Sequence, residues 1–375
     1  MLRKRPPLVP WLCAILAAIA GWQALYCAAA TQGKISGLFF IGERMHWPAE
    51  IERGAFVYPN TEGYDGQLYR VIAHDPGMRG AGLTLYGPRY WYRRILIPAS
   101  AALPGGDVDF WYVAITDLIL ALGGVCFVRL AVDVCRPIVA AAVYCAIPAV
   151  VASTDRMVVD GPMLALSIVA WWCYRERRFA PMLGALTAAV LARETALCVV
   201  AGIGLAYLLQ REYRRAFAVA ATALPAVAWW IWLALRTAPT SMDHQLSIPL
   251  LPQLARLFSG NPRVGAAPWV NAVLQSLDVV GCLCLLFAFG WVAAALVRER
   301  GLSEETAIIL PMACAAMFFS SPALLSEPYH FLRHASVLIV WVGLELMRVR
   351  SAYGAAYLVA AGLPMLVYRG TLLLK

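Results

Sequence analysis

Long apolar stretches, separated by short polar breaks, run through almost the whole chain. As helices, they are long enough to cross, or nearly cross, a bilayer hydrocarbon core of roughly 30 Å. The stretches are residues 8–30, 109–129, 137–152, 159–174, 179–192, 195–209, 216–235, 271–297, 306–320, 333–347 and 352–368. The pattern therefore predicts an all-α fold, a polytopic transmembrane bundle of about eleven helices that forms a single membrane-embedded domain over residues 1–375.

The composition excludes the classes of protein that are surrounded by water. Of the 375 residues, 61% are hydrophobic and 14% are charged, whereas a soluble domain carries about 45–50% apolar and about 25% charged residues. The ten cysteines lie in or beside apolar stretches, so we interpret them as small buried hydrophobes rather than as a redox pair or a zinc site. Soluble, fibrous and disordered proteins are therefore excluded.

The basic residues set the orientation of the predicted bundle. If the N-terminus is cytoplasmic, every second turn carries a basic cluster, as the positive-inside rule requires. These clusters are Arg129 with Arg136, Arg175 with Arg177 and Arg178, Arg211 with Arg214 and Arg215, Arg298 with Arg300, and Arg348 with Arg350. The long loops 31–108 and 236–270 then lie on the non-cytoplasmic side. We interpret the first stretch as an uncleaved anchor, because it is longer than the apolar part of a signal peptide.

The polar residues that are unusual for a membrane protein share the non-cytoplasmic side of this topology. A charge at membrane depth costs about 2.5–3.5 kcal/mol on insertion scales, so each needs a structural or functional reason. The candidates are Tyr64, Asp65, Gln67, Tyr69, Asp75, Arg93, Arg94, Asp155, Asp160, Arg193, Glu194, His330, Arg333 and His334. We expect them to meet at the outer membrane boundary.

Each candidate also has a structural interpretation. Asp65 and Asp75 precede a glycine and a proline and are suited to turns, and Asp160 is suited to the N-cap of the helix that follows it. Arg94 beside its aromatic neighbours fits an interfacial anchor. Arg193 with Glu194 fits an internal ion pair, and His330 with His334 lacks the further ligands of a zinc site.

Taken together, the candidates suit one kind of chemistry. A carboxylate in a glycine-flanked loop accepts a proton from an acceptor hydroxyl. Arginine presents a fixed fork of donors to phosphate oxygens, and aromatic side chains line sugars. The combination predicts a reaction between a lipid-borne phosphate and an acceptor that arrives from the aqueous side.

Three strings of the chain resemble a known family. Residues 63–69 (GYDGQLY), 73–76 (AHDP) and 92–98 (YRRILIP) are similar to the first outer loop of bacterial multi-pass glycosyltransferases of the GT-C superfold. Arg193-Glu194-Thr195 also resembles a motif of that group. The resemblance implies an enzyme of the bacterial inner membrane that moves a sugar from a polyprenyl-phosphate donor to a glycan, lipid or protein acceptor on the periplasmic or exterior side.

The resemblance also implies roles for particular residues. An acidic residue of the first outer loop is the usual base of such enzymes, and this role maps onto Asp65. Many members carry a paired acidic motif, from which this chain departs because Glu62 and Asp65 are three residues apart. Arg93, Arg193 and Arg333 are then expected to hold the donor phosphate, and Tyr64, Gln67, Tyr69, Asp75, Asp155, Asp160, Glu194 and His330 to contact substrate.

The sequence leaves the metal and several rival functions open. Glu62, Asp65 and Asp155 offer oxygen ligands of the kind that Mg²⁺ or Mn²⁺ prefers, but no cofactor is required by the pattern. A transporter or lipid-linked glycan flippase also needs charges within the membrane, although it typically has two related halves, and we find no repeat. A polymerase or ligase that transfers a whole glycan, or an assembly subunit without chemistry, also fits the pattern.

Overall fold

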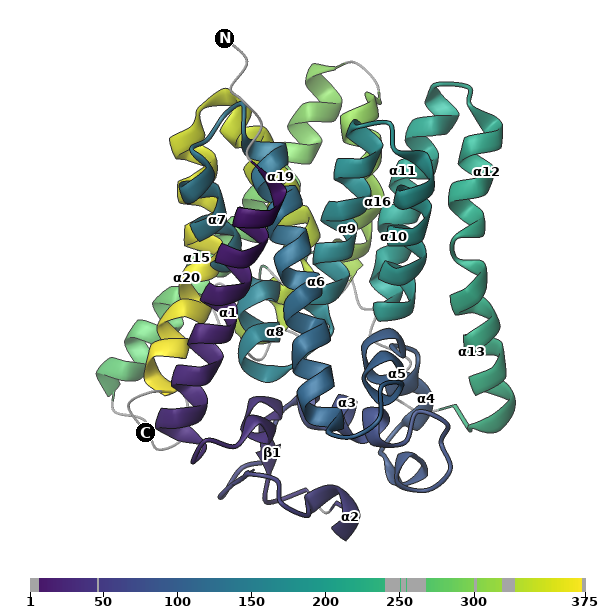
Figure 1. Ribbon diagram of the computed structural model, residues 1–375. Helices are drawn as coiled ribbons and strands as arrows, with labels where there is room; N and C mark the ends of the chain where they lie inside the picture. Colours follow the sequence, from purple (N-terminus) through teal and green to yellow (C-terminus); the bar gives the residue numbers. More distant parts are fainter. Residues whose placement is uncertain are drawn as a thin grey trace.

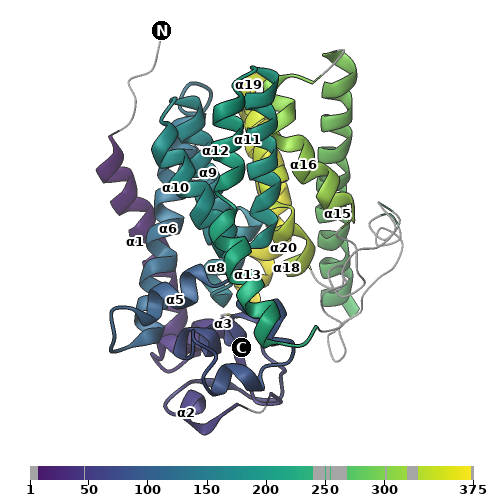
Figure 2. The same cartoon turned by 90° about the vertical axis from the view of Figure 1, so that its right-hand side faces the viewer.

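A computed structural model describes residues 7–45, 47–239, 250, 254, 268–299, 302–318 and 328–372. For residues 49, 50, 328–330, 371 and 372 it describes the backbone alone. The described part is nearly all-α, as the sequence predicts, and forms one helical bundle with the residues of the first loop folded against one end (Figures 1 and 2). Most of the predicted second outer loop, which includes residues 240–249 and 255–267, lies outside the described residues.

The bundle is built from long helices and from helices that stop part of the way through it. Its described helices are α1 (Leu8–Ala30), α6 (Val108–Ala131), α7 (Pro137–Cys145), α8 (Pro148–Arg156), α9 (Asp160–Arg175), α10 (Phe179–Ala192), α11 (Leu197–Leu209), α12 (Tyr213–Ala221), α13 (Leu224–Arg236), α15 (Pro268–Arg298), α16 (Glu304–Phe318), α18 (Pro328–His334), α19 (Ser336–Val349) and α20 (Ser351–Leu372). The described residues of each predicted apolar stretch fall mainly on one of these helices or on two consecutive ones.

Five segments in the described part of the chain are long and apolar enough to cross a membrane by themselves. They are α1, α6, the α12–α13 pair, α15 and most of α20. The pair α7 and α8 makes a sixth if it counts as one span, although the two helices bend by 58°. The bend has a local cause, because Ile147 precedes Pro148 and takes an extended conformation, which is the one favoured before proline.

The helices run in alternating directions, so that the predicted basic turns gather at one end of the bundle. Helices α6, α9, α11, α15 and α19 end on the side where α1 begins (Figure 1), and Arg129, Arg175, Arg298 and Arg348 lie in the last turns of four of them. The first loop covers the opposite end (Figure 2). The alternation inferred from the basic residues therefore agrees with the directions of the helices.

The first loop is folded into short elements. They are η1 (Ile35–Phe39), β1 (Ile41–Gly42), α2 (Ala49–Glu52), β2 (Val57–Tyr58), α3 (Asp65–His74), η2 (Ala81–Thr84), α4 (Pro88–Tyr92) and α5 (Leu96–Ala102). Strands β1 and β2 pair in parallel, with Ile41 opposite Val57. An ion pair fastens α3 to the start of α6, because Arg70 Nε donates to both Asp109 oxygens at 2.8 and 2.9 Å.

Gly66 lets α3 approach the bundle closely. A Cβ at this position would lie 1.9 Å from the backbone oxygen of Arg156 at the end of α8, and 3.0 Å from that of Phe39. Backbone atoms cannot move aside as a flexible side chain does, so only glycine permits this contact. The sequence motif around Asp65 therefore contains a glycine that serves packing.

We expect Gly66→Ala to lower the thermal unfolding midpoint of the purified protein by several degrees, because overpacking costs about 1–3 kcal/mol. Gly184→Ala in α10 is the matched control, since a Cβ there meets nothing within 4 Å. Equal midpoints for the two variants would show that α3 is not held against α8 in this way.

Candidate functional site

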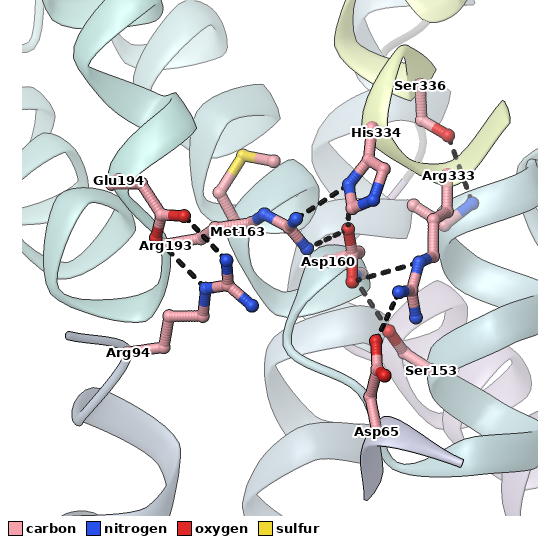
Figure 3. A network of polar contacts seen from close by, with 12 residues as sticks. Asp65, Arg94, Ser153, Asp160, Met163, Arg193, Glu194, Arg333, His334 and Ser336 are labelled. Carbon is pink, nitrogen blue, oxygen red and sulfur yellow. Dashed lines mark hydrogen bonds and ion pairs between the residues drawn. The ribbon is translucent and has the colours of Figure 1, made fainter. Parts of the chain in front are cut away.

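A cluster of charged side chains lies where several helices of the bundle stop. Asp160 begins α9, Arg193 follows the end of α10, and Arg333 and His334 end α18. Asp65 reaches the same cluster from the start of α3 (Figure 3). Residues far apart in the chain therefore meet at helix ends, on the loop-covered side of the bundle.

Asp160 lies at the centre of the cluster. Its Oδ1 accepts a hydrogen bond from Arg193 Nη1 and lies 3.2 Å from His334 Nδ1. Its Oδ2 lies 3.7 Å from Arg333 Nε. The carboxylate is 1% exposed, so the arginines compensate a charge that burial would otherwise make costly. Asp160 is the first residue of α9, one position after the N-cap Val159, so it is not the N-cap that the sequence suggests.

Asp65 forms an ion pair with Arg333 at the edge of the cluster. Arg333 Nη2 donates to Asp65 Oδ2, and the Arg333 guanidinium also lies 5.1 Å from the centre of the Tyr64 ring. The side chain of Arg333 is 3% exposed, whereas that of Asp65 is 22% exposed. Asp65 is therefore the accessible member of the pair, and the predicted meeting of Asp65, Arg193 and Arg333 is what the structure contains.

A second arginine–carboxylate pair lies beside the first. Arg94 Nε and Nη2 donate to the two oxygens of Glu194 at 3.0 and 2.6 Å, and Arg94 Nη1 donates to Tyr69 Oη at 2.7 Å. Burial raises the pKa of Tyr69, and the positive charge of Arg94 offsets part of that rise. Tyr69 therefore stays a neutral phenol that accepts from Arg94.

The pairing corrects two sequence expectations. Arg94, not Arg93, is the buried arginine, and it serves the cluster rather than an interfacial anchor. The side chain of Arg93 is only half-buried, and its backbone oxygen accepts from Trp230 Nε1 at 3.2 Å. The sequence also allows an ion pair between Arg193 and Glu194, but Arg193 pairs with Asp160 and Glu194 with Arg94.

We expect Arg94→Lys to lower the thermal unfolding midpoint and any activity, whereas Arg93→Lys leaves both nearly unchanged. Lysine keeps the charge but lacks the planar fork that binds both Glu194 oxygens, and a lost hydrogen bond to a charged group costs about 1.5–3 kcal/mol. The two adjacent substitutions are chemically identical. An equal effect of both, measured by thermal unfolding in detergent, would contradict the assignment.

Two of the predicted substrate-binding residues, Asp155 and Gln67, have structural partners outside the cluster. Asp155 accepts from Arg369 Nε at 3.0 Å and from Trp22 Nε1 at 2.7 Å, which ties α8 to α20 and α1. Gln67 bridges the Gly42 N–H and the Glu62 carbonyl within the first loop. These contacts give Asp155 and Gln67 a role in holding the fold together.

Asp75 caps a turn of the first loop. Its carboxylate accepts from the backbone N–H groups of Arg79, Gly80 and Gly82 at 2.8, 2.8 and 3.0 Å. Partial burial raises the pKa of Asp75, but these hydrogen bonds outweigh it and lower the pKa below its ordinary value. The structural interpretation of Asp75 as a turn residue is therefore the one that the geometry supports.

The structure describes the side chain of one of the two candidate histidines. The side chain of His330 lies outside the described residues. His334, a candidate to which the sequence assigned no role in binding or catalysis, is buried, and its Nδ1 lies 2.6 Å from Arg193 Nη2. The same Nδ1 lies 3.2 Å from Asp160 Oδ1, so His334 contacts both members of the Arg193–Asp160 pair. The signal in the sequence was the position of His334 next to Arg333.

Several buried polar atoms of the cluster have no hydrogen-bond partner among the residues that the structure describes. They are Arg333 Nε and Nη1, Arg193 Nε, His334 Nε2, Thr195 Oγ1 and Asp160 Oδ2. Donors predominate, and buried polar groups are nearly always paired in folded proteins. The site therefore has an excess of buried donors, which suits an oxyanion ligand.

A metal ion fits the same residues poorly. Within the described ranges, no group of three or more His, Cys, Asp or Glu side chains is arranged to hold a metal ion. Of the oxygen ligands that the sequence offered, Asp65 is paired with Arg333 and Asp155 with Arg369. The three carboxylates of the cluster instead match its three arginines in charge.

Compared with family models, curated proteins and solved structures, the chain matches none of them. What the site does chemically is therefore inferred from its own residues.

Proposed function

We propose that the protein is a glycosyltransferase of the GT-C kind, which moves a sugar from a polyprenyl-phosphate donor to an acceptor hydroxyl on the non-cytoplasmic face of the membrane. The observation that carries the proposal is the set of buried arginines behind an accessible carboxylate. Arg333 and Arg193 keep guanidinium N–H groups without a partner among the described residues. The partly exposed Asp65 forms an ion pair with Arg333. The resemblance of residues 63–69 to the first outer loop of GT-C enzymes points the same way.

The buried arginines suit the leaving group of such a reaction. A phosphate ester gains negative charge on its oxygens as the bond to the sugar breaks, and fixed donors in a site without water stabilise that charge. Arg333 and Arg193 are held in place by Asp160, so they need little reorganisation. Losing one such donor typically costs about 2.7–4 kcal/mol of barrier.

Asp65 suits the base. In the proposed reaction, the carboxylate takes the proton of the acceptor hydroxyl, and the hydroxyl oxygen bonds to the anomeric carbon. The bond from that carbon to the phosphate oxygen breaks, and the lipid phosphate leaves with the electron pair. A single displacement inverts the anomeric centre.

The depth of the cluster supports an active site near the outer boundary. Helices α9 and α19 have 16 and 14 residues, so at 1.5 Å per residue they reach about 21–24 Å from the basic end of the bundle. The middle of a hydrocarbon core of about 30 Å lies at about 15 Å. The cluster is thus closer to the loop-covered side, where an aqueous acceptor arrives.

A transporter or flippase is the second candidate, because one feature favours it. Asp117 lies inside α6 and is 4% exposed. It accepts from Gln23 Nε2 at 3.0 Å and lines a cavity of about 590 Å³ between α1 and α6. A carboxylate within a membrane-spanning helix often marks a path for an ion or substrate.

The two candidates are separated by one assay. Purified protein in detergent, where no transport takes place, is incubated with a panel of radiolabelled polyprenyl-phosphate sugars and candidate acceptors, and release of the lipid phosphate is followed. We expect release from one sugar, unchanged in Asp117→Asn. If no donor of the panel releases its phosphate, while the protein in vesicles moves a lipid-linked sugar in a way that needs Asp117, the flippase replaces the transferase.

A further inference from the structure

The charges of the cluster are balanced before any substrate arrives. Asp65, Asp160 and Glu194 provide three negative charges, and Arg94, Arg193 and Arg333 provide three positive ones. A phosphate that enters this site adds negative charge to a cluster that is already neutral. Because like charges at close range repel strongly in a buried site, one of the resident carboxylates must give way.

We propose that the donor phosphate replaces Asp65 as the anion on Arg333, and that this exchange releases Asp65 to act as the base. The inference rests on the proposed function, and it adds the order of events at the site. The lipid phosphate binds first, and the carboxylate, no longer paired with Arg333, then meets the acceptor.

Asp65 is the carboxylate best placed to leave. Its side chain is 22% exposed, and it belongs to α3 of the first loop rather than to a helix of the bundle. Asp160 is 1% exposed and is held by Arg193 and Arg333 together with His334, so it cannot follow. Glu194 accepts from Nε and Nη2 of Arg94, so its departure would not provide a place on Arg333.

Arg333 has the donors that a replacement needs. Its Nη2 donates to Asp65, while its Nη1 and Nε have no hydrogen-bond partner among the described residues. The phosphodiester of the donor has two non-bridging oxygens. One of them can accept from the Nη2 that Asp65 uses, and the other can accept from Nη1 or Nε, which Asp65 leaves unpaired.

The exchange couples binding to reactivity. A carboxylate that is paired with a guanidinium takes up a proton less readily than a free one. While Asp65 stays on Arg333 it is a poor base, and it becomes a better one when the phosphate takes its place. An enzyme built this way does not activate an acceptor or water before its donor is present.

The test measures binding rather than turnover. A polyprenyl monophosphate without sugar is titrated into the purified wild-type protein and into Asp65→Asn, and the Kd is measured by native mass spectrometry or tryptophan fluorescence. We expect Asp65→Asn to bind the phosphate at least about fivefold more tightly, because the competing internal anion is gone. Glu62→Gln is the control, since it removes an exposed negative charge three residues away, and its Kd should stay within about twofold of wild type.

Every outcome decides the proposal. If Asp65→Asn binds the monophosphate as weakly as wild type or more weakly, while the wild-type protein turns over a sugar donor, the exchange is overturned but the transferase function is not. No binding of the monophosphate to either protein, together with no turnover, overturns both. Asp65→Ser is measured in parallel, so that a folding defect of one variant does not decide the result.

Discussion

Asp65→Asn is expected to leave a folded, membrane-inserted protein whose turnover of the lipid-linked donor falls by about 10²–10⁴-fold, the usual contribution of a general base. Asparagine has nearly the same shape as aspartate but cannot accept the proton of the acceptor hydroxyl. Turnover is measured as release of lipid phosphate from the donor identified by the panel.

Two controls separate the loss of the base from other effects. Glu62→Gln changes a neighbouring exposed acid and should keep wild-type turnover. The thermal unfolding midpoint of Asp65→Asn should stay close to that of wild type, since the lost ion pair is partly exposed. Near-normal turnover by a folded Asp65→Asn protein would refute Asp65 as the base.

The second large effect is expected from Asp160→Asn, which should lower the free energy of unfolding by about 3–5 kcal/mol, as breaking a buried ion pair does. The substitution leaves the buried guanidinium of Arg193 without its carboxylate partner. It also removes the negative charge that Asp160 places near Arg333. We expect poor yield and a strongly lowered thermal unfolding midpoint in detergent. The same substitution at the exposed Asp133 should change neither.

A double variant shows whether uncompensated charge is the cause. Arg193→Gln in the background of Asp160→Asn removes one of the cations that Asp160 compensates, and it should restore part of the midpoint. A further fall of the midpoint would mean that Asp160 acts through packing or hydrogen bonds alone. The readout is thermal unfolding, so it does not depend on knowing the substrate.

The location of the helices was accessible from the sequence because it depends on local properties. Apolar stretches and the breaks between them are read over a few residues, and the described residues of each predicted stretch fall mainly on a helix or a pair of helices. The lengths of the helices were harder to predict. The chain is interrupted at the proline at residue 148 and at residues 157–159 and 193–196, within or between apolar stretches. The number of membrane crossings, predicted as about eleven, stays a prediction beside the five helical segments that are long and apolar enough on their own.

The pairs of side chains within the site were harder to predict from the sequence than the location of the site. The side on which Asp65, Asp160, Arg193 and Arg333 would meet followed from the alternating topology. The sequence did not show that Arg94, rather than Arg93, is the buried arginine. Helix α4 ends at Tyr92, so no helical periodicity fixes the direction of the residues that follow. Asp155 was expected at the site, but it is bound by Arg369, which lies 214 residues later in the chain.

The sequence by itself determined that this chain is a set of apolar helices with its basic turns on one side and its unusual polar residues on the other, because hydrophobicity and charge act residue by residue. The tertiary structure alone decided which carboxylate pairs with which arginine. Such a pair depends on where each helix stops and how it is rotated against its neighbours, and these are properties of packing between distant segments.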